Sequence, residues 1–180
     1  LKGINNQIKQ IEKLVNEFSD FARMPKPIFK ENNLVDIIQE NINLLKELDN
    51  SIDINFKKDL NKITLESDKE QISRVFLNLI KNSIESINQK AQNNNNFSKK
   101  ITIELTQGDS HIKSTIEDNG VGFNELKNNI KDILNPYFTT KKNGTGLGLS
   151  IVNKIINDHN GKIDFIPIQN GAKINITFLK

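Results

Sequence analysis

Two asparagines and a lysine stand at helical spacing in residues 78–83, which read NLIKNS. Asn78 and Asn82 are four residues apart, so on a helix they share a face. An asparagine carbonyl is a neutral oxygen ligand that suits Mg²⁺, and the ammonium of Lys81 suits a phosphate group. An exposed polar helix face in an asparagine-rich chain has the same pattern, so this segment alone does not establish a binding site.

A second segment, residues 118–122 (DNGVG), directly follows a predicted strand. The carboxylate of Asp118 can accept a hydrogen bond from an exocyclic amine. Gly120 and Gly122 permit positive φ and a close approach of the backbone to a ligand. An ordinary turn after a strand is the alternative interpretation.

A third segment, residues 144–149 (GTGLGL), opens a predicted helix. Its glycines expose backbone N–H groups, and the helix dipole adds positive potential, which together suit a phosphate. The segment lacks the GxGxxG spacing of a dinucleotide-binding turn, and no Lys-Ser or Lys-Thr pair follows it as in a Walker loop. A glycine-rich turn by itself is weak evidence.

The elements that must position these segments follow from hydrophobic periodicity. Asp68 and Gln71 have the spacing of a capping box at the start of the helix that carries the first segment. We predict an α+β two-layer sandwich, with helices on one face of a mixed, mainly antiparallel sheet. The predicted helices cover 33–48, 68–90 and about 146–159, and the predicted strands cover 52–56, 101–106, 112–117, 162–168 and 172–179.

One long helix is predicted to precede this sandwich, over residues 1–24. Its apolar residues recur at alternating steps of three and four, as in a heptad seam, and Leu14 and Phe21 widen the stripe as in a four-helix bundle. A helix packed on its own domain is the alternative. The prolines in residues 24–27 (MPKP) end the helix. The seam residues are Leu1, Ile4, Ile8, Ile11, Val15, Phe18 and Ala22.

Composition excludes several classes of function. The 180 residues suit one domain with a small appendage, and the absence of Cys excludes disulfides, thiolate metal sites and Cys nucleophiles. His111 and His159 lack metal-ligand spacing. A net charge of +3 with interspersed signs predicts no nucleic-acid partner. No apolar run approaches a membrane span, and because Leu1 is not Met we expect the chain to be part of a longer protein.

In order and spacing, the three segments resemble the nucleotide-binding boxes of the GHKL superfamily, which includes gyrase, the MutL repair proteins, certain chaperones and histidine kinases. The resemblance extends over about residues 29–180. Residues 136–141 (PYFTTK) resemble the phenylalanine-containing box that separates histidine kinases from the other branches. The resemblance implies an ATP-binding catalytic domain over 28–180, with a mobile lid at about 123–143.

The resemblance also implies a role for each matched residue. Asn82 would coordinate Mg²⁺, and Asn78 would help to position the ion or the phosphates. Lys81 and Lys141 would contact phosphates and, with Asn78, form the catalytic set. Asp118 would recognise the adenine amine. The other nucleotide-binding residues implied in this way are Gly120, Gly122, Phe138, Thr139, Thr140, Gly144, Thr145, Gly146, Leu147, Gly148 and Leu149.

Asn78 marks a departure within the superfamily. Gyrase-like and MutL-like ATPases carry at this position a Glu that acts as the general base for water. Because Asn cannot accept a proton, the resemblance implies a site that holds ATP without efficient hydrolysis and transfers its γ-phosphate to a histidine. Glu85 is a weak alternative base, and we interpret it as a charge on the helix surface.

The N-terminal segment, over residues 12–27, resembles the second hairpin helix of NtrY-type nitrogen-regulation sensor kinases. Residues 1–27 would then be part of a dimerisation and phosphotransfer hairpin. The His-Glu acceptor motif of the first hairpin helix is missing, and neither His111 nor His159 is followed by an acid. We expect the chain alone to bind nucleotide without phosphorylating itself. His159, near a helix end, is interpreted as a favourable partner of the helix dipole.

The implied partners are ATP with Mg²⁺, a response regulator of the NtrX type, and a second copy of the full-length protein joined through the N-terminal helix. The implied location is cytoplasmic, as the soluble part of a membrane-anchored bacterial sensor. Three alternatives stay open: a non-catalytic nucleotide-binding module, an ATPase clamp of the gyrase or MutL type, and a Ser/Thr kinase of the anti-sigma type. Asn78 and Phe138 argue against the clamp, and the heptad helix argues against the anti-sigma type.

Overall fold

The structure is a computed structural model that describes residues 8, 11–12, 14–16, 18–19, 22–92, 97–123, 130–141 and 144–180. The described residues between 8 and 22 have helical backbone. The predicted seam positions Leu1 and Ile4, and Phe21, which widens the stripe, lie outside the described residues. Parts of the predicted lid, 124–129 and 142–143, also lie outside them.

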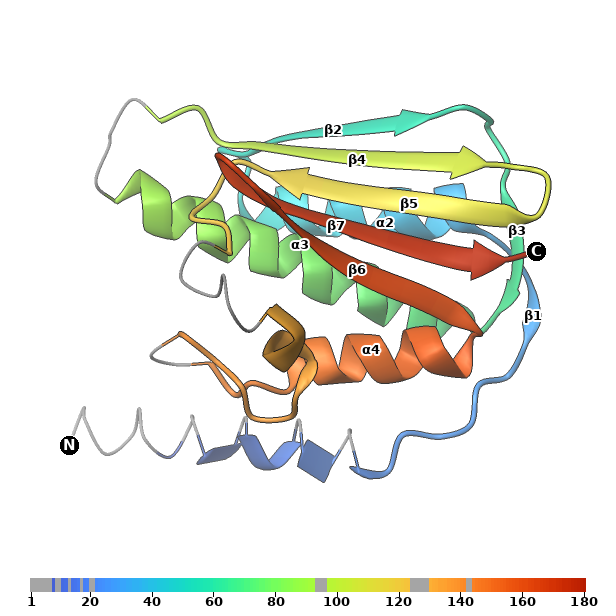
Figure 1. Cartoon of the computed structure of the whole chain (residues 1–180), viewed down its shortest axis with the longest axis horizontal. Coiled ribbons are helices and arrows are strands. Elements are labelled where there is room, and N and C mark those ends of the chain that lie inside the picture. The colour runs from blue at the N-terminus through green and yellow to red at the C-terminus, as the bar shows by residue number, and fades with distance from the viewer. Residues whose placement is uncertain are drawn as a thin grey trace.

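A five-stranded sheet forms one layer of the molecule, in the order β2-β4-β5-β7-β6. β2 runs parallel to β4, and the other neighbours are antiparallel. The helices α2 (Leu34–Leu48), α3 (Lys69–Ala91) and α4 (Gly148–Asp158) lie on one side of this sheet (Figure 1). The predicted two-layer sandwich with a mixed, mainly antiparallel sheet is confirmed. The sheet comprises β2 (Asp53–Lys58), β4 (Lys100–Gln107), β5 (His111–Asp118), β6 (Gly161–Ile168) and β7 (Gly171–Leu179).

The helices begin where side chains can cap them. In α2 (Leu34–Leu48), the side chain of Asn33 accepts a hydrogen bond from the backbone N–H of Val35 at 3.2 Å. In α3 (Lys69–Ala91), the carboxylate of Asp68 accepts from the N–H of Gln71 at 3.1 Å. An N-cap of this kind stabilises a helix by about 1 kcal/mol, because it satisfies a backbone donor that has no partner within the helix.

The predicted capping box at α3 is wrong in its second half. Instead of returning to the backbone of Asp68, the side-chain amide of Gln71 donates to the carbonyl of Pro25 at 3.0 Å. The N–H of Asp68 donates to Nε2 of His159 at 3.0 Å. Nε2 of His159 and the carbonyl of Pro25 therefore replace the reciprocal contact that the sequence spacing favours.

The third helix, α4 (Gly148–Asp158), begins two residues later than predicted. Gly146 has φ of +70°, which is outside the helical region, and it ends the preceding turn. Leu147, at the N-cap position, has no side-chain oxygen with which to cap the first turn. The first turn of α4 thus differs from those of α2 and α3, where side chains occupy the backbone donors.

Three elements were not predicted. β1 (Lys30–Asn33) and β3 (Thr64–Ser67) pair antiparallel in a separate two-stranded sheet, and η2 (Ile130–Leu134) is a short 3₁₀ helix. β1 reads KENN and has no apolar alternation, so period-two analysis cannot detect it. Its pairing with β3, rather than its own sequence, makes it a strand.

The core lies between the sheet and the three helices and consists mostly of Ile and Leu. Phe76 from α3 and Phe178 from β7 are its largest fully buried side chains. One face of α3 lies in this core, and its other face carries exposed polar side chains such as Lys81 and Glu85. Within the described residues, no helix is long and apolar enough to cross a membrane.

Candidate functional site

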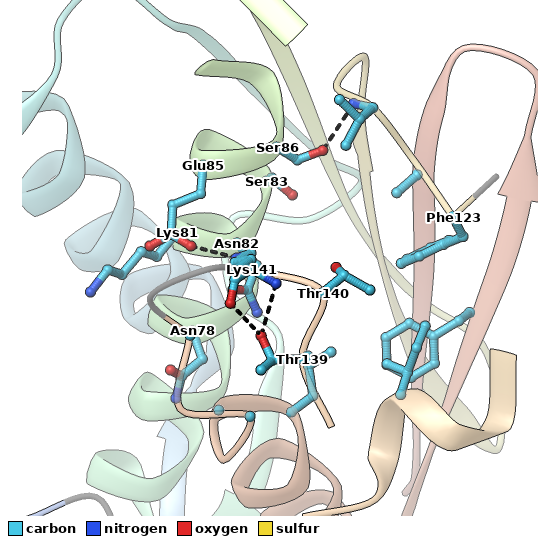
Figure 2. Close-up of a pocket in the computed structure, with 18 of the residues that line it drawn as sticks. Asn78, Lys81, Asn82, Ser83, Glu85, Ser86, Phe123, Thr139, Thr140 and Lys141 are labelled. Atoms are coloured by element: carbon cyan, nitrogen blue, oxygen red, sulfur yellow. Dashed lines mark hydrogen bonds and ion pairs between the residues drawn. The ribbon is translucent and has the colours of Figure 1, made fainter. Parts of the chain in front are cut away.

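A pocket lies between α3, the loop that follows β5, and residues 138–141 and 144–149 (Figure 2). The three sequence segments and the phenylalanine-containing segment all contribute to its walls, and they come from three distant parts of the chain. Gly120 and Leu147 do not line it, since both are buried behind the wall. The predicted residues that line the pocket are Asn78, Lys81, Asn82, Asp118, Gly122, Phe138, Thr139, Thr140, Lys141, Gly144, Thr145, Gly146, Gly148 and Leu149.

Asp118 is the most deeply buried carboxylate of the pocket, with 5% of its surface exposed. Burial raises the pKa of Asp118 above its ordinary value, because desolvation disfavours the charged form. Hydrogen bonds from the N–H of Gly120 at 2.9 Å and from Ser83 oppose this rise. A buried carboxylate that still has unused acceptor capacity can bind a donor from a ligand.

Two glycines hold the loop after β5 against the start of β7. A Cβ at Gly122, where φ is +73°, would lie 2.9 Å from the carbonyl carbon of Gly171. A Cβ at Gly171, where φ is +122°, would lie 2.7 Å from the carbonyl carbon of Asp118. Both contacts are too short for any other residue, so the backbone of β7 closes the floor of the pocket behind Asp118.

Gly171 was not predicted as a residue of the site, because Asn170-Gly171 is also the sequence of an ordinary turn. Its importance follows from the pairing of Asp118 with Ala172 across β5 and β7. The pairing register of β5 with β7 cannot be predicted from a local sequence pattern.

The segment before α4 folds back on itself at the mouth of the pocket. The N–H of Tyr137 donates to the carbonyl of Gly146 at 3.0 Å, and the N–H of Gly144 donates to that of Lys141 at 3.1 Å. Thr139 accepts through its hydroxyl from the N–H of Lys141 at 3.1 Å. These bonds place the first turn of α4, including Gly148, in the pocket wall. Backbone donors and the helix dipole there favour an anion.

The side chain of Lys141 extends from the phenylalanine-containing segment to α3. Its ammonium donates to Oδ1 of Asn82 at 2.9 Å and forms an ion pair with Glu85. Glu85 is exposed on the surface of α3, as predicted, and it also lines the pocket and is paired with a residue of the phenylalanine-containing segment. Both side chains are about two-fifths exposed (39% and 44%), so solvent screens the pair.

The other two residues predicted to contact phosphate or metal lie on the same helix. Asn78 donates from its side-chain amide to the carbonyl of Arg74 at 3.0 Å, and its Oδ1 faces the first turn of α4 near Gly148. Lys81 is exposed, and Figure 2 shows its side chain pointing away from Lys141. Asn78 thus spans the gap between α3 and α4, whereas the ammonium of Lys81 lies outside the closed part of the pocket.

The donor set around Asn82 fits a cation that brings most of its own ligands. Oδ1 of Asn82 already contacts the ammonium of Lys141, beside the carboxylate of Glu85. Among the described residues there is no group of three or more His, Cys, Asp or Glu that could hold a metal by itself. Mg²⁺ suits such a place when phosphate oxygens and water complete its octahedron.

The two histidines lie away from the pocket. His111 is exposed at the start of β5. His159 is buried, its Nδ1 donates to the carbonyl of Ile155 at 2.8 Å, and its Nε2 accepts from the N–H of Asp68. An N–H can only donate and a carbonyl can only accept, so this ring is the neutral tautomer with its proton on Nδ1. The contact with the carbonyl of Ile155 lies in the last turn of α4, where the sequence predicts a favourable partner of the helix end.

Comparisons with known proteins agree with this geometry. The family described as "Histidine kinase-, DNA gyrase B-, and HSP90-like ATPase" matches residues 67–180. A putative sensor histidine kinase NtrY-like of Rickettsia bellii is 34% identical over 183 residues, covering 99% of this chain. Nitrogen regulation protein NtrY of Azorhizobium caulinodans is 31% identical over 177 residues, covering 97% of this chain. The chain spans 28% and 22% of these relatives' lengths.

Solved structures show the same arrangement. The catalytic domain of histidine kinase ThkA superposes with a TM-score of 0.73 at 32% identity, covering 85% of this chain and 96% of that one. ThkA in complex with the response regulator protein TrrA gives a TM-score of 0.78 at 29% identity, covering 98% of this chain and 49% of that one. These likenesses confirm the predicted fold and the predicted resemblance to sensor histidine kinases.

Proposed function

We propose, since the chain belongs to the family of histidine kinase-, DNA gyrase B- and HSP90-like ATPases, that it binds ATP with Mg²⁺ and transfers the γ-phosphoryl group to a histidine on a hairpin helix. One observation carries the proposal. Four separate segments of the chain meet around one pocket, with a buried carboxylate at its floor and the open first turn of a helix at its mouth. One end of the pocket can therefore accept a hydrogen bond from a base, and the other end can bind an anion. A nucleotide has both groups, a base at one end and phosphates at the other.

The base end of the pocket is built around Asp118. Its carboxylate would accept a hydrogen bond from the exocyclic amine of adenine. Gly122 would allow the base to approach the backbone, with Gly120 shaping the turn from behind. Phe138 and Leu149 would provide apolar contact, since both line the pocket.

The phosphate end is built from α4, α3 and the phenylalanine-containing segment. Backbone donors at Gly144, Gly146 and Gly148 would cradle phosphate oxygens. Lys141 would exchange its contacts with Asn82 and Glu85 for a phosphate group. Thr139, Thr140, Thr145 and Lys81 line the pocket and would contribute at its rim, and Leu147 would support them from the core.

The metal end is Asn82, with Asn78 beside it. When bound, Mg²⁺ neutralises phosphate charge and fixes its orientation. Asn82 would supply one neutral oxygen ligand, and Asn78 would orient phosphate groups between α3 and α4. The ammonium of Lys141, which contacts Oδ1 of Asn82, would have to leave that oxygen.

Transfer to a histidine suits this site better than hydrolysis. In the transfer, the bond between the γ-phosphorus and the bridging oxygen breaks, ADP leaves, and a phosphorus–nitrogen bond forms as the histidine loses its proton. Hydrolysis needs a base for water, and Asn78 cannot accept a proton. Glu85 is already paired with Lys141. The site's contribution is positioning and charge neutralisation.

The wider organisation is part of the proposal. Residues 1–27 would form the second helix of a dimerisation hairpin, and 28–180 the ATP-binding domain with its lid at about 123–143. The acceptor histidine would come from the other hairpin helix, within a homodimer of the full-length protein. The phosphoryl group would pass to an aspartate of a response regulator, which for NtrY-like kinases would be of the NtrX type. The domain would work in the cytoplasm as part of a membrane-anchored sensor.

Calorimetric titration with ATP tests the binding step. ATP should bind in the presence of Mg²⁺, and Asp118→Ala should abolish detectable binding, because it removes the buried carboxylate at the base end. Asn82→Ala should instead remove the dependence of affinity on Mg²⁺. Ser98→Ala, at an exposed position away from the pocket, is the control. Unchanged ATP affinity in Asp118→Ala would show that the base end is assigned wrongly.

A further inference from the structure

Lys90 lies near the C-terminal end of α3, against the loop that follows β5. Its ammonium donates to the carbonyl of Asn119 at 2.9 Å and to the carbonyl of Gly120 at 3.0 Å. The ammonium also lies 5.1 Å from the centre of the Phe97 ring, within the range of a cation–π contact. The side chain is partly buried and does not line the pocket. Lys90 therefore contacts the wall of the pocket from behind.

The two carbonyls belong to peptide units whose N–H groups are also held. The unit from Asn119 to Gly120 donates its N–H to Oδ1 of Asp118 at 2.9 Å. The next unit, from Gly120 to Val121, donates its N–H to the hydroxyl of Ser86 at 3.0 Å. A trans peptide is planar, with its C=O and N–H pointing in opposite directions. When Lys90 fixes each carbonyl, it fixes the direction of each N–H.

We propose that Lys90 is a positioning residue for nucleotide recognition: by holding these two peptide units it aims the carboxylate of Asp118 and sets the preference for adenine over guanine. This inference rests on the proposed function, because it assumes that Asp118 binds the base. The N–H of Gly120, the hydroxyl of Ser83 and the N–H of Ala172 all donate to this carboxylate. A carboxylate has about four acceptor sites, so the direction of the site left for a ligand depends on how these donors are held. Adenine offers an amine donor at its C6 position, whereas guanine offers a carbonyl oxygen that a carboxylate repels.

The chemistry of the side chain suits this role. One ammonium can donate to two carbonyls at once, and charged donors make stronger hydrogen bonds than neutral ones. Ser86 stands four residues before Lys90 on the same face of α3, so the helix presents both anchors to one short loop. Gly120 can lie there only because it lacks a side chain: a Cβ would lie 2.7 Å from the backbone carbonyl carbon of Ser86.

Lys99 offers a matched control. It is a lysine near the same end of α3, and its ammonium donates to Oδ1 of Asn88 at 2.8 Å and to the hydroxyl of Ser51 at 3.1 Å. These contacts link α3 to the start of β4 without touching the carbonyls of residues 119 and 120. A variant at Lys99 therefore measures the loss of a lysine from this region without loss of the loop anchor.

The test compares ATP and GTP affinities, measured by calorimetry for the whole chain with Mg²⁺. In Lys90→Met, ATP affinity should fall by about tenfold and GTP affinity should stay within about twofold of the wild type, so that the preference for ATP shrinks by about tenfold. Lys90→Arg, which keeps a charged donor, should restore most of the preference. Lys99→Met should keep the wild-type ratio.

An unchanged ratio of ATP affinity to GTP affinity in Lys90→Met would overturn the role, even if the variant melts at a lower temperature. Loss of a purely structural lysine would weaken the binding of both nucleotides equally. A wild type without a preference for ATP would contradict the proposed base recognition itself, which distinguishes the two failures. Amide hydrogen exchange gives a second measurement if Lys90→Met does not fold. In nucleotide-free Lys90→Gln, exchange at the amides of Gly120 and Val121 should accelerate relative to the β4–β5 ladder, and unchanged exchange there would also overturn the role.

Discussion

Replacing Gly171 by Ala tests whether the start of β7 holds Asp118 in place. The added methyl group would lie 2.7 Å from the carbonyl carbon of Asp118 and 2.8 Å from Cα of Asn119, and the backbone has φ of +122°. Strain in a conformation that L-residues rarely adopt costs about 1–3 kcal/mol. Forcing a methyl group into a packed region costs about 1–3 kcal/mol more. Together these terms predict a loss of roughly 2–6 kcal/mol in the free energy of unfolding.

That loss is large against the stability of an ordinary domain, about 5–15 kcal/mol. Urea denaturation of the wild type and Gly171→Ala measures it, and titration with ATP measures its effect on the pocket. The clash is with backbone atoms of the Asp118 loop, so any relief moves Asp118, and ATP affinity should fall in the molecules that remain folded.

Gly108→Ala is the matched control, because this glycine also lies in a turn beside β5. A Cβ there would meet only the side chain of His111, at 3.1 Å, which can rotate away. The control should lose less than about 1 kcal/mol and keep its ATP affinity. If Gly171→Ala unfolds within about 1 kcal/mol of the wild type and binds ATP equally well, the proposed contact between β7 and the Asp118 loop is not required.

Three further predictions concern single side chains. Burial raises the pKa of Asp118, and its ionised form accepts a hydrogen bond from an amine more strongly than the protonated form, so ATP affinity should fall on acidification at a pH above the ordinary aspartate value. ATP titrations over a pH series check this, and a fall only near the ordinary value would contradict it. His159→Leu removes the ring that joins the N–H of Asp68 to the carbonyl of Ile155. Urea denaturation should show a free energy of unfolding lower by about 2–4 kcal/mol, with ATP affinity unchanged. An equally stable variant would contradict a stabilising role for these two hydrogen bonds. Glu85→Gln removes the exposed partner of Lys141 and frees its ammonium for phosphate. Since such pairs contribute at most about 1 kcal/mol, ATP affinity measured by titration should rise by no more than about fivefold. A fall in affinity would mean that Glu85 assists binding directly.

Much of the site could be predicted because its chemistry is concentrated in short segments. The asparagines of α3, the DNGVG loop and the GTGLGL turn each contain residue types whose donors, acceptors or conformational freedom indicate a role. The sheet could be predicted because its strands alternate around Ile and Leu. The strand β1 could not, because its four residues become a strand only by pairing with β3.

The contacts that could not be predicted join residues distant in sequence. Gly171 meets Asp118 through the register of two strands, and Lys141 meets Glu85 across the pocket. Lys90 has an unremarkable position at the end of a helix, and only its distance to two carbonyls indicates a role. Periodicity reports which face of an element is buried, but it does not report which polar groups meet when elements pack.

Transfer of the γ-phosphoryl group to a histidine is the central claim, and its most direct test uses γ-labelled ATP. The chain would be mixed with a separate hairpin fragment of the full-length protein that carries the acceptor histidine, and with the same fragment bearing a His→Gln change. We predict acid-labile label on the first fragment, none on the second, and none on the chain itself. Release of inorganic phosphate at the same rate with either fragment, without label on the histidine, would contradict the account and indicate an ATPase instead.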